Sequence, residues 1–194
     1  HKSLTSLTTG CHNTGLGYGS LCNATTACDN DAMGYGALGA LTTGTRNTAV
    51  GFAAGNATTT GACNFFGGNA AGTKNTTGHS NTASGSYALY KNTTGACNQA
   101  YGTLSLYHNT TGCFNSGFGR ATLCSNTTAS CNTAVGSCAL GKNTTGVNNT
   151  GVGGYVMQAN TTGTDNVGVG YKALNATTTG KDNAALGREA LLNN

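Results

Sequence analysis

Residues 144–160 read TTGVNNTGVGGYVMQAN, and this seventeen-residue unit decides the fold because the whole chain repeats it. The unit recurs eleven times from Thr8 onward without an insertion or a deletion. Such an unbroken period means that every unit occupies the same environment, which is typical of a solenoid or an array. When the first Thr of each unit is position 1, positions 1 and 2 are always Thr, position 6 is always Asn and position 10 is always Gly. Position 1 falls at residues 8, 25, 42, 59, 76, 93, 110, 127, 144, 161 and 178.

The length and composition of the unit indicate a β-solenoid rather than a helical repeat, whose units run from about 33 residues upward. The centre of the unit, as in Asn132–Gly136 (NTAVG), is a short β-like run bounded by Gly-rich turns. A second short strand is expected around Ala88-Leu89 and its equivalents. We therefore predict an all-β fold, a narrow β-solenoid (β-roll) of eleven rungs with one rung per repeat, forming a single repeat domain over residues 1–194. Stacking at ~4.8 Å per rung would give a rod on the order of 50 Å long.

Each invariant position has a physical role in such a stack. Thr is β-branched and suits a strand end or corner, so its two columns are expected there. The Asn column can form a ladder of side-chain amides, each bonded to the rung beside it. The Gly column marks a place where φ is positive or where backbones approach closely.

The two apolar positions predict which surfaces are buried. Position 8 is mostly Ala or Gly, whereas position 9 is mostly large and apolar. Successive strand residues face opposite sides, so one face carries small groups and the other large ones. A strand that is apolar on both faces is buried on both. One face is then the interior of the solenoid, and we expect the other to meet a second copy of the chain, in a trimer or a laterally associated fibre.

One irregular unit offers a test of this geometry. Position 8 of the fourth unit is Phe66, where other units have Ala or Gly. Nearby, the Leu that recurs at position 14 is replaced by Gly55 and Gly72. We predict that Phe66 fills the space above these two glycines, so that the total interior volume is conserved.

Composition and charge exclude several classes of function. Only 7% of residues are charged, and the net charge of +4 includes no basic run, so neither nucleic acid nor an anionic membrane is an expected partner. No apolar stretch approaches the ~20 residues of a membrane-spanning helix. No signal peptide is visible and the chain starts at His1, so we interpret it as a mature or excised piece of something longer. Both ends resemble uncapped rungs, which allows continuation of the chain or end-to-end assembly.

Nine Cys without a CxxC motif favour disulfides in an oxidising compartment over a metal site. Cys11 and Cys28 share position 4 of adjacent rungs, and a separation of ~4.8 Å suits a disulfide. Free buried Cys residues that pack like small hydrophobes are the alternative. The other candidates for pairing between neighbouring rungs are Cys97, Cys113 and Cys131 as one group, and Cys124 with Cys138; Cys22 and Cys63 have no obvious partner and are free or pair with another chain.

Ten N-x-[S/T] sequons are candidates for N-glycosylation, most of them at the recurring N-T-T-G junction. A chain so rich in Asn and Thr also creates sequons by chance, and in a bacterial or phage setting they would be bare. The candidates are Asn23, Asn56, Asn75, Asn92, Asn109, Asn126, Asn143, Asn148, Asn160 and Asn175.

Residues for catalysis or for a cofactor are not grouped in the sequence. The five acids lie at opposite ends of the rod, in the second unit and the last two units, and the four His residues lie in different columns several rungs apart. No pair has the proximity that acid–base, nucleophilic or metal chemistry requires. We therefore expect no enzyme activity, no cofactor and no metal.

The stretch Asn132–Gly146 resembles two kinds of repeat. One is the head repeat of trimeric autotransporter adhesins, and the other is the N-T-A-V-G-x-x-A-L repeat of phage and algal-virus tail-fibre-like proteins. The resemblance covers nearly the whole chain and implies a left-handed β-roll, often trimeric, exposed outside the cell or virion and used for adhesion or as a fibre shaft. The many Cys depart from the adhesin heads, which are generally Cys-poor, and favour a secreted, oxidised fibre.

Three functions are compatible with these patterns. The first is a non-enzymatic structural protein, a subunit or segment of an extracellular fibre built from stacked rungs. The second is an adhesin or receptor-binding module, in which Tyr87, Tyr107, Arg120 and Tyr155 would contact a surface glycan or receptor; the eight Tyr look scattered, which disfavours it. The third is an ice-binding solenoid, which needs two Thr columns on one flat face, whereas adjacent Thr residues should face opposite sides.

Overall fold

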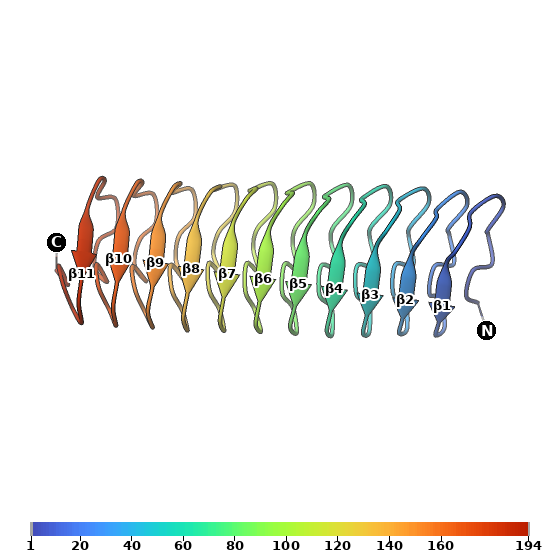
Figure 1. The fold of residues 1–194 in the computed structure, drawn as a ribbon, viewed down its shortest axis with the longest axis horizontal. Helices are drawn as coiled ribbons and strands as arrows, with labels where there is room; N and C mark the ends of the chain where they lie inside the picture. Colours follow the sequence, from blue (N-terminus) through green and yellow to red (C-terminus); the bar gives the residue numbers. More distant parts are fainter. Residues whose placement is uncertain (1, 194) are drawn as a thin grey trace.

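A computed structural model describes residues 2–193 and shows eleven parallel strands stacked in chain order as an all-β solenoid (Figure 1). Each strand has three residues and pairs with the next in a register of seventeen, as in Thr14 with Asp31. The predicted fold class is confirmed. The strands are β1 (Thr14–Leu16), β2 (Asp31–Met33), β3 (Thr48–Val50), β4 (Phe65–Gly67), β5 (Thr82–Ser84), β6 (Gln99–Tyr101), β7 (Ser116–Phe118), β8 (Thr133–Val135), β9 (Thr150–Val152), β10 (Val167–Val169) and β11 (Ala184–Leu186).

The second strand expected around Ala88-Leu89 is not formed, and that expectation was wrong. Leu89 has a φ of +50°, and the Leu of position 14 takes the same left-handed conformation in the other rungs. A left-handed residue turns the chain and breaks the alternation of a strand. The segment still bonds to the next rung, because the Leu89 amide donates to the Ser105 carbonyl at 3.0 Å.

The Gly column at position 10 has the two properties that its invariance predicts. Gly51 has a φ of +133°, and the other glycines of the column have similarly positive values. A Cβ on Gly51 would also lie 2.5 Å from the Gly68 carbonyl oxygen of the next rung. Any other residue would therefore suffer both backbone strain and a clash with the rung above it.

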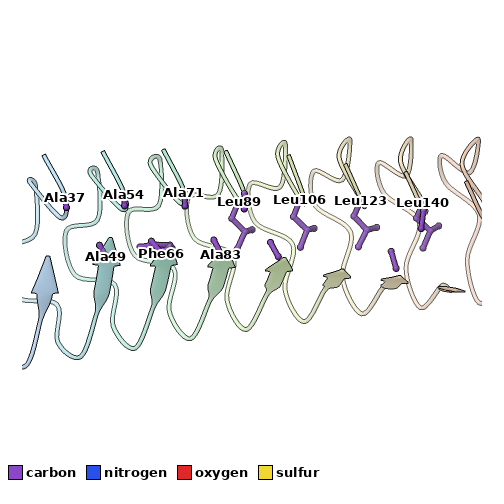
Figure 2. Close-up of a cluster of buried hydrophobic side chains, with 14 of the residues drawn as sticks. Ala37, Ala49, Ala54, Phe66, Ala71, Ala83, Leu89, Leu106, Leu123 and Leu140 are labelled. Atoms are coloured by element: carbon purple, nitrogen blue, oxygen red, sulfur yellow. The ribbon is translucent and has the colours of Figure 1, made fainter. Parts of the chain in front are cut away.

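The interior is formed by the small residues of the strands and by the turn opposite them. The central residue of most strands is buried, and Ala at position 13 and Leu at position 14 approach it from the other side (Figure 2). The small face of the strands is therefore the interior, a choice between the two faces that the sequence pattern had left open. The core is consequently a single narrow column that runs along the rod.

Phe66 occupies this column as the sequence predicts. It is buried between Ala49 and Ala83 of the adjacent strands (Figure 2). A Cβ on Gly55 would lie 2.5 Å from Cδ2 of the Phe66 ring, and one on Gly72 would overlap the same ring. The ring therefore replaces the volume of the two missing Leu side chains.

The predicted Asn ladder at position 6 is present in all eleven rungs, from Asn13 to Asn183. Each Oδ1 accepts from both the backbone N–H and the side-chain amide of the Asn in the next rung. For Asn98, Oδ1 accepts from the Asn115 backbone at 3.0 Å and from Nδ2 of Asn115 at 3.1 Å. Because these amides are buried, the ladder satisfies polar groups that would otherwise be costly in the interior.

A second Asn ladder runs along position 17 of the central rungs, and the sequence reasoning missed it. The ladder runs from Asn75 to Asn160, and from Asn92 onward each Nδ2 donates to Oδ1 of the preceding rung, as in Asn92 to Asn75 at 2.8 Å. The same Nδ2 also donates to the carbonyl at position 3 of the following unit. Asn160 Oδ1 and Thr58 Oγ1 are the buried side-chain atoms without a partner in the described part of the chain, and they lie where this ladder ends.

Candidate functional site

The largest exposed feature of the sheet is its outer side, where large apolar side chains alternate with Thr and other polar residues. It consists of the first and third residues of β1–β11, which we call the outer strip. None of these residues is buried, and Asp31 is the one charged residue in these strands. The exposed large apolar members are Leu16, Met33, Val50, Phe65, Tyr101, Phe118, Val152, Val167 and Leu186.

The area of the outer strip can be estimated from the spacing of the rungs. Eleven strands at ~4.8 Å and a width on the order of 10 Å give ~500 Å². Because the first residue of most strands is polar, the apolar part of this footprint is smaller and falls within the few hundred Å² of exposed apolar patches on monomeric proteins. Exposed rings at position 11, including Tyr18, Tyr35 and Phe52, follow the strip after one Gly and extend it.

Stacking of the rungs gathers aromatic residues that look scattered in the sequence. Tyr18, Tyr35 and Phe52 share position 11, and their neighbouring ring centroids are 5.5 Å apart. Tyr90 and Tyr107 share position 15 and stack at 5.2 Å. The period of seventeen was the signal for these pairs, so the expectation of scattered aromatics was wrong.

The residues proposed to contact a ligand do not form one group. Tyr107 belongs to the second stack, and Tyr87 lies against both rings of that stack. Tyr155 packs on Tyr171, and Arg120 is exposed elsewhere.

A cleft of about 300 Å³ lies beside the first aromatic stack. Its floor is open because Gly19, Gly36 and Gly39 carry no side chains there. Asn56 closes one end by donating from Nδ2 to the Gly36 carbonyl at 2.7 Å. The rim combines flat rings with amide groups and backbone carbonyls, which is the donor and acceptor set that a neutral sugar can use. The remaining lining residues include Tyr18, Tyr35, Cys22, Asn23 and Ala40.

Among the titratable residues of the described chain, His12 Nδ1 lies 3.1 Å from Asp29 Oδ1, and both side chains are exposed. The thiols of Cys11 and Cys28 lie beside this pair. Hydrogen bonds from Thr164 and Asn148 lower the pKa of the exposed Asp165 carboxyl. The same part of the chain contains no group of three or more His, Cys, Asp or Glu side chains that could hold a metal ion, and no helix with the length and apolar character of a membrane crossing.

All nine Cys residues are free thiols in the structure, so the expected disulfides are absent from it and stay a prediction for the oxidised protein. Cys11 and Cys28 lie side by side with their Sγ atoms 2.7 Å apart, as their shared position predicts. Cys131 and Cys113 meet through the backbone, where the Cys131 amide donates to the Cys113 carbonyl at 3.1 Å. The thiol of Cys22 donates to the Gly39 carbonyl at the cleft. Cys63 is exposed, and Cys97 is half-buried.

Two thiols have raised pKa values. The hydrogen bond that Cys11 donates to Cys28 raises the pKa of Cys11, and burial raises the pKa of Cys124, with a further contribution from Cys138 nearby. A thiol with a raised pKa carries less thiolate at neutral pH and is a poorer nucleophile. At neutral pH the raised pKa values therefore slow both nucleophilic attack by these thiols and their oxidation to a disulfide.

We expect mild oxidation to join Cys11 to Cys28 before any other pair. The raised pKa should make the reaction slow at neutral pH and faster at alkaline pH, where the thiolate is populated. The resulting loop of seventeen residues should stabilise the N-terminal rungs by ~3 kcal/mol. Peptide mapping without reductant checks the linkage, with Cys11→Ser as the control. A dominant link from Cys97 to Cys113 would contradict the prediction.

Six of the ten sequons cannot carry a glycan in this fold, which corrects the expectation for them. Their Asn residues form the second ladder, are buried, and use Nδ2, the atom that a glycan would occupy, as a donor. The buried sequons are Asn75, Asn92, Asn109, Asn126, Asn143 and Asn160. Asn23 and Asn148 are exposed and Asn56 and Asn175 are half-buried, so these four stay candidates.

The two Thr columns differ in exposure and in bonding. Thr at position 1 is half-buried in most rungs, and its hydroxyl donates to the carbonyl of the same Thr in the next rung, as in Thr76 to Thr93 at 3.0 Å. Thr at position 2 is exposed in every rung. One Thr column, not a pair, is therefore free to contact solvent.

No protein family model, no curated protein and no solved structure matches this chain.

Proposed function

We propose that this chain is a structural protein, the subunit or segment of an extracellular fibre in which rods associate side by side with copies of themselves. The observation that carries the proposal is the outer strip, in which nine of the eleven strands of a regular rod expose a large apolar side chain. A face of this kind is expected to be covered by a partner, and a second copy offers the same length and the same rung spacing.

Substitutions within the outer strip should weaken self-association without unfolding the rod. Phe118→Ser with Val152→Ser removes two exposed apolar side chains at position 9, where Ser84 already shows that Ser is accommodated. Loss of two central apolar contacts should raise the dissociation constant about 100-fold or more. Sedimentation velocity measures the change.

The matched control is Tyr87→Ala, which removes an exposed aromatic ring from position 12. Ala53, Ala70 and Ala121 stand at this position with the same positive φ, so the backbone tolerates Ala. The control should associate like the wild type. Equal weakening by both variants would show that the strip is not the interface.

Cryo-electron microscopy under non-reducing conditions tests the fibre itself. Filaments with a rise of ~4.8 Å between rungs, bundled through the strip, would support the proposal. Discrete short particles would contradict it and favour an adhesin or receptor-binding module instead. The observation that favours this alternative is the cleft at Tyr18 and Tyr35. An ice-binding role has less support, because the hydroxyls of one Thr column are already bonded to the backbone.

A further inference from the structure

Acidic and basic side chains are distributed unequally along the rod, although the net charge of the whole chain is only +4. All five acids lie in the second rung and the last two rungs, whereas residues 42–160 contain no Asp or Glu. The ion pairs in the described part of the chain, His12–Asp29 and Arg188–Glu189, lie outside this central stretch. The cations of the centre therefore have no acidic partner on the rod. They are Arg46, Lys74, Lys91, Arg120 and Lys142.

Three of these cations form one line with a histidine. Lys74, Lys91, His108 and Lys142 share position 16 of rungs four, five, six and eight, and we call them the lysine row. The backbone holds the row in register, because the Lys74 amide donates to the Tyr90 carbonyl and the Lys91 amide to the Tyr107 carbonyl, both at 3.0 Å. The three Lys side chains are exposed.

This arrangement is unfavourable for the rod alone. Lys74 and Lys91 are one rung apart, at ~4.8 Å between backbones, and like charges facing each other on neighbouring strands are destabilising. No carboxylate in the central rungs offsets the repulsion. An anion that spans several rungs would remove it.

Tyr90 and Tyr107, at the adjacent position 15, supply neutral donors beside the row. Their rings stack on each other with 7° between their planes, and Lys91 Nζ lies 5.6 Å from the centroid of Tyr107. Their hydroxyls make no hydrogen bond within residues 2–193 and are not buried, so they are accessible to a ligand. His108 Nδ1 donates to the Cys124 carbonyl at 3.0 Å, which leaves Nε2 for another contact.

We propose that the lysine row binds a linear polysaccharide that carries carboxylate or sulfate groups. Ammonium groups in a line, with Tyr hydroxyls beside them, match acidic groups and hydroxyls spaced along an extended sugar chain. Single-stranded nucleic acid is a poorer match because its bases need free aromatic faces, and Tyr90 and Tyr107 cover each other. Several weak contacts along one polymer add up to useful affinity. The proposal does not depend on assembly into a fibre.

The test measures binding of the full chain to a heparin oligosaccharide and to polygalacturonate, with neutral dextran for comparison. The row variant combines Lys74→Ala, Lys91→Ala and Lys142→Ala; position 16 is already Ala at residues 40, 57, 159 and 176, so the fold should tolerate it. The control variant combines Arg46→Asn, Arg120→Ser and Lys181→Ala. This variant also removes three positive charges, and each replacement is a residue that other rungs carry at the equivalent position.

We expect the row variant to bind at least one acidic polysaccharide about tenfold more weakly than the wild type, as the loss of three accessible ion pairs implies. The control should lose less than about threefold, and binding should weaken with added salt. Equal losses in the two variants would reveal diffuse attraction and overturn the proposal. Absence of binding to both polysaccharides would also overturn the proposal. So would an oligonucleotide of equal charge that binds more tightly than either polysaccharide and loses this affinity in the row variant.

Discussion

Replacing Asn98 by Ala is expected to lower the free energy of unfolding by about 4 kcal/mol or more, because it breaks a buried ladder in its middle. Asn98 Nδ2 donates to Asn81 Oδ1 at 3.2 Å and to the Gly112 carbonyl at 2.8 Å. Its Oδ1 accepts two bonds from Asn115. The substitution leaves the amide groups of Asn115 and the Gly112 carbonyl buried with fewer partners, and each buried unsatisfied group costs about 1–3 kcal/mol.

The neighbouring substitution Gln99→Ser is the control. Gln99 is exposed, and Ser116 occupies the same position in the next rung, so the midpoint of urea unfolding should hardly move. Hydrogen exchange of the Asn115 backbone N–H should also accelerate in the Asn98→Ala variant, because this N–H loses its acceptor, Oδ1 of Asn98. Unchanged protection there, or equal midpoints for the two variants, would show that the ladder contributes little.

Features that repeat in every rung could be predicted from the sequence. The Asn ladder and the Gly column follow from the period together with ordinary side-chain chemistry. The position of Phe66 could be predicted because the register between rungs is fixed. The large ring at position 8 could therefore be matched with the Leu side chains that Gly55 and Gly72 lack. In these cases the fold adds no information beyond which rungs are neighbours.

Features that depend on the path of the chain between strands could not be predicted. The left-handed turn at Leu89 is made by an ordinary apolar residue, and nothing in the pair Ala-Leu distinguishes it from a strand. The inward direction of Asn75 depends on that turn, so a buried ladder was interpreted as a row of glycosylation sites. The aromatic stacks and the lysine row were missed for a different reason. Their residues are visible in the sequence only when it is read in columns of seventeen.

The second large effect is expected at Phe66, where Phe66→Ala should lower the free energy of unfolding by about 3–5 kcal/mol. The loss comes from the cavity left beside Gly55 and Gly72, which cannot fill the space themselves. Gly55→Leu alone should also destabilise the rod, because its Cβ would clash with the Phe66 ring. Urea unfolding followed by circular dichroism measures both changes.

The combined variant, with Phe66→Ala, Gly55→Leu and Gly72→Leu, should recover most of this loss. It converts these rungs to the pattern of their neighbours, in which Leu at position 14 packs against Ala at position 8. The positive φ of Gly55 and Gly72, both +58°, adds no special penalty, since Leu89 and Leu106 adopt +50° and +52° in the same column. The substitutions should therefore be strongly non-additive, as expected for residues in contact. Simple addition of the single losses would mean that Phe66 and the two glycines do not share one interior, and that the core is not a continuous column.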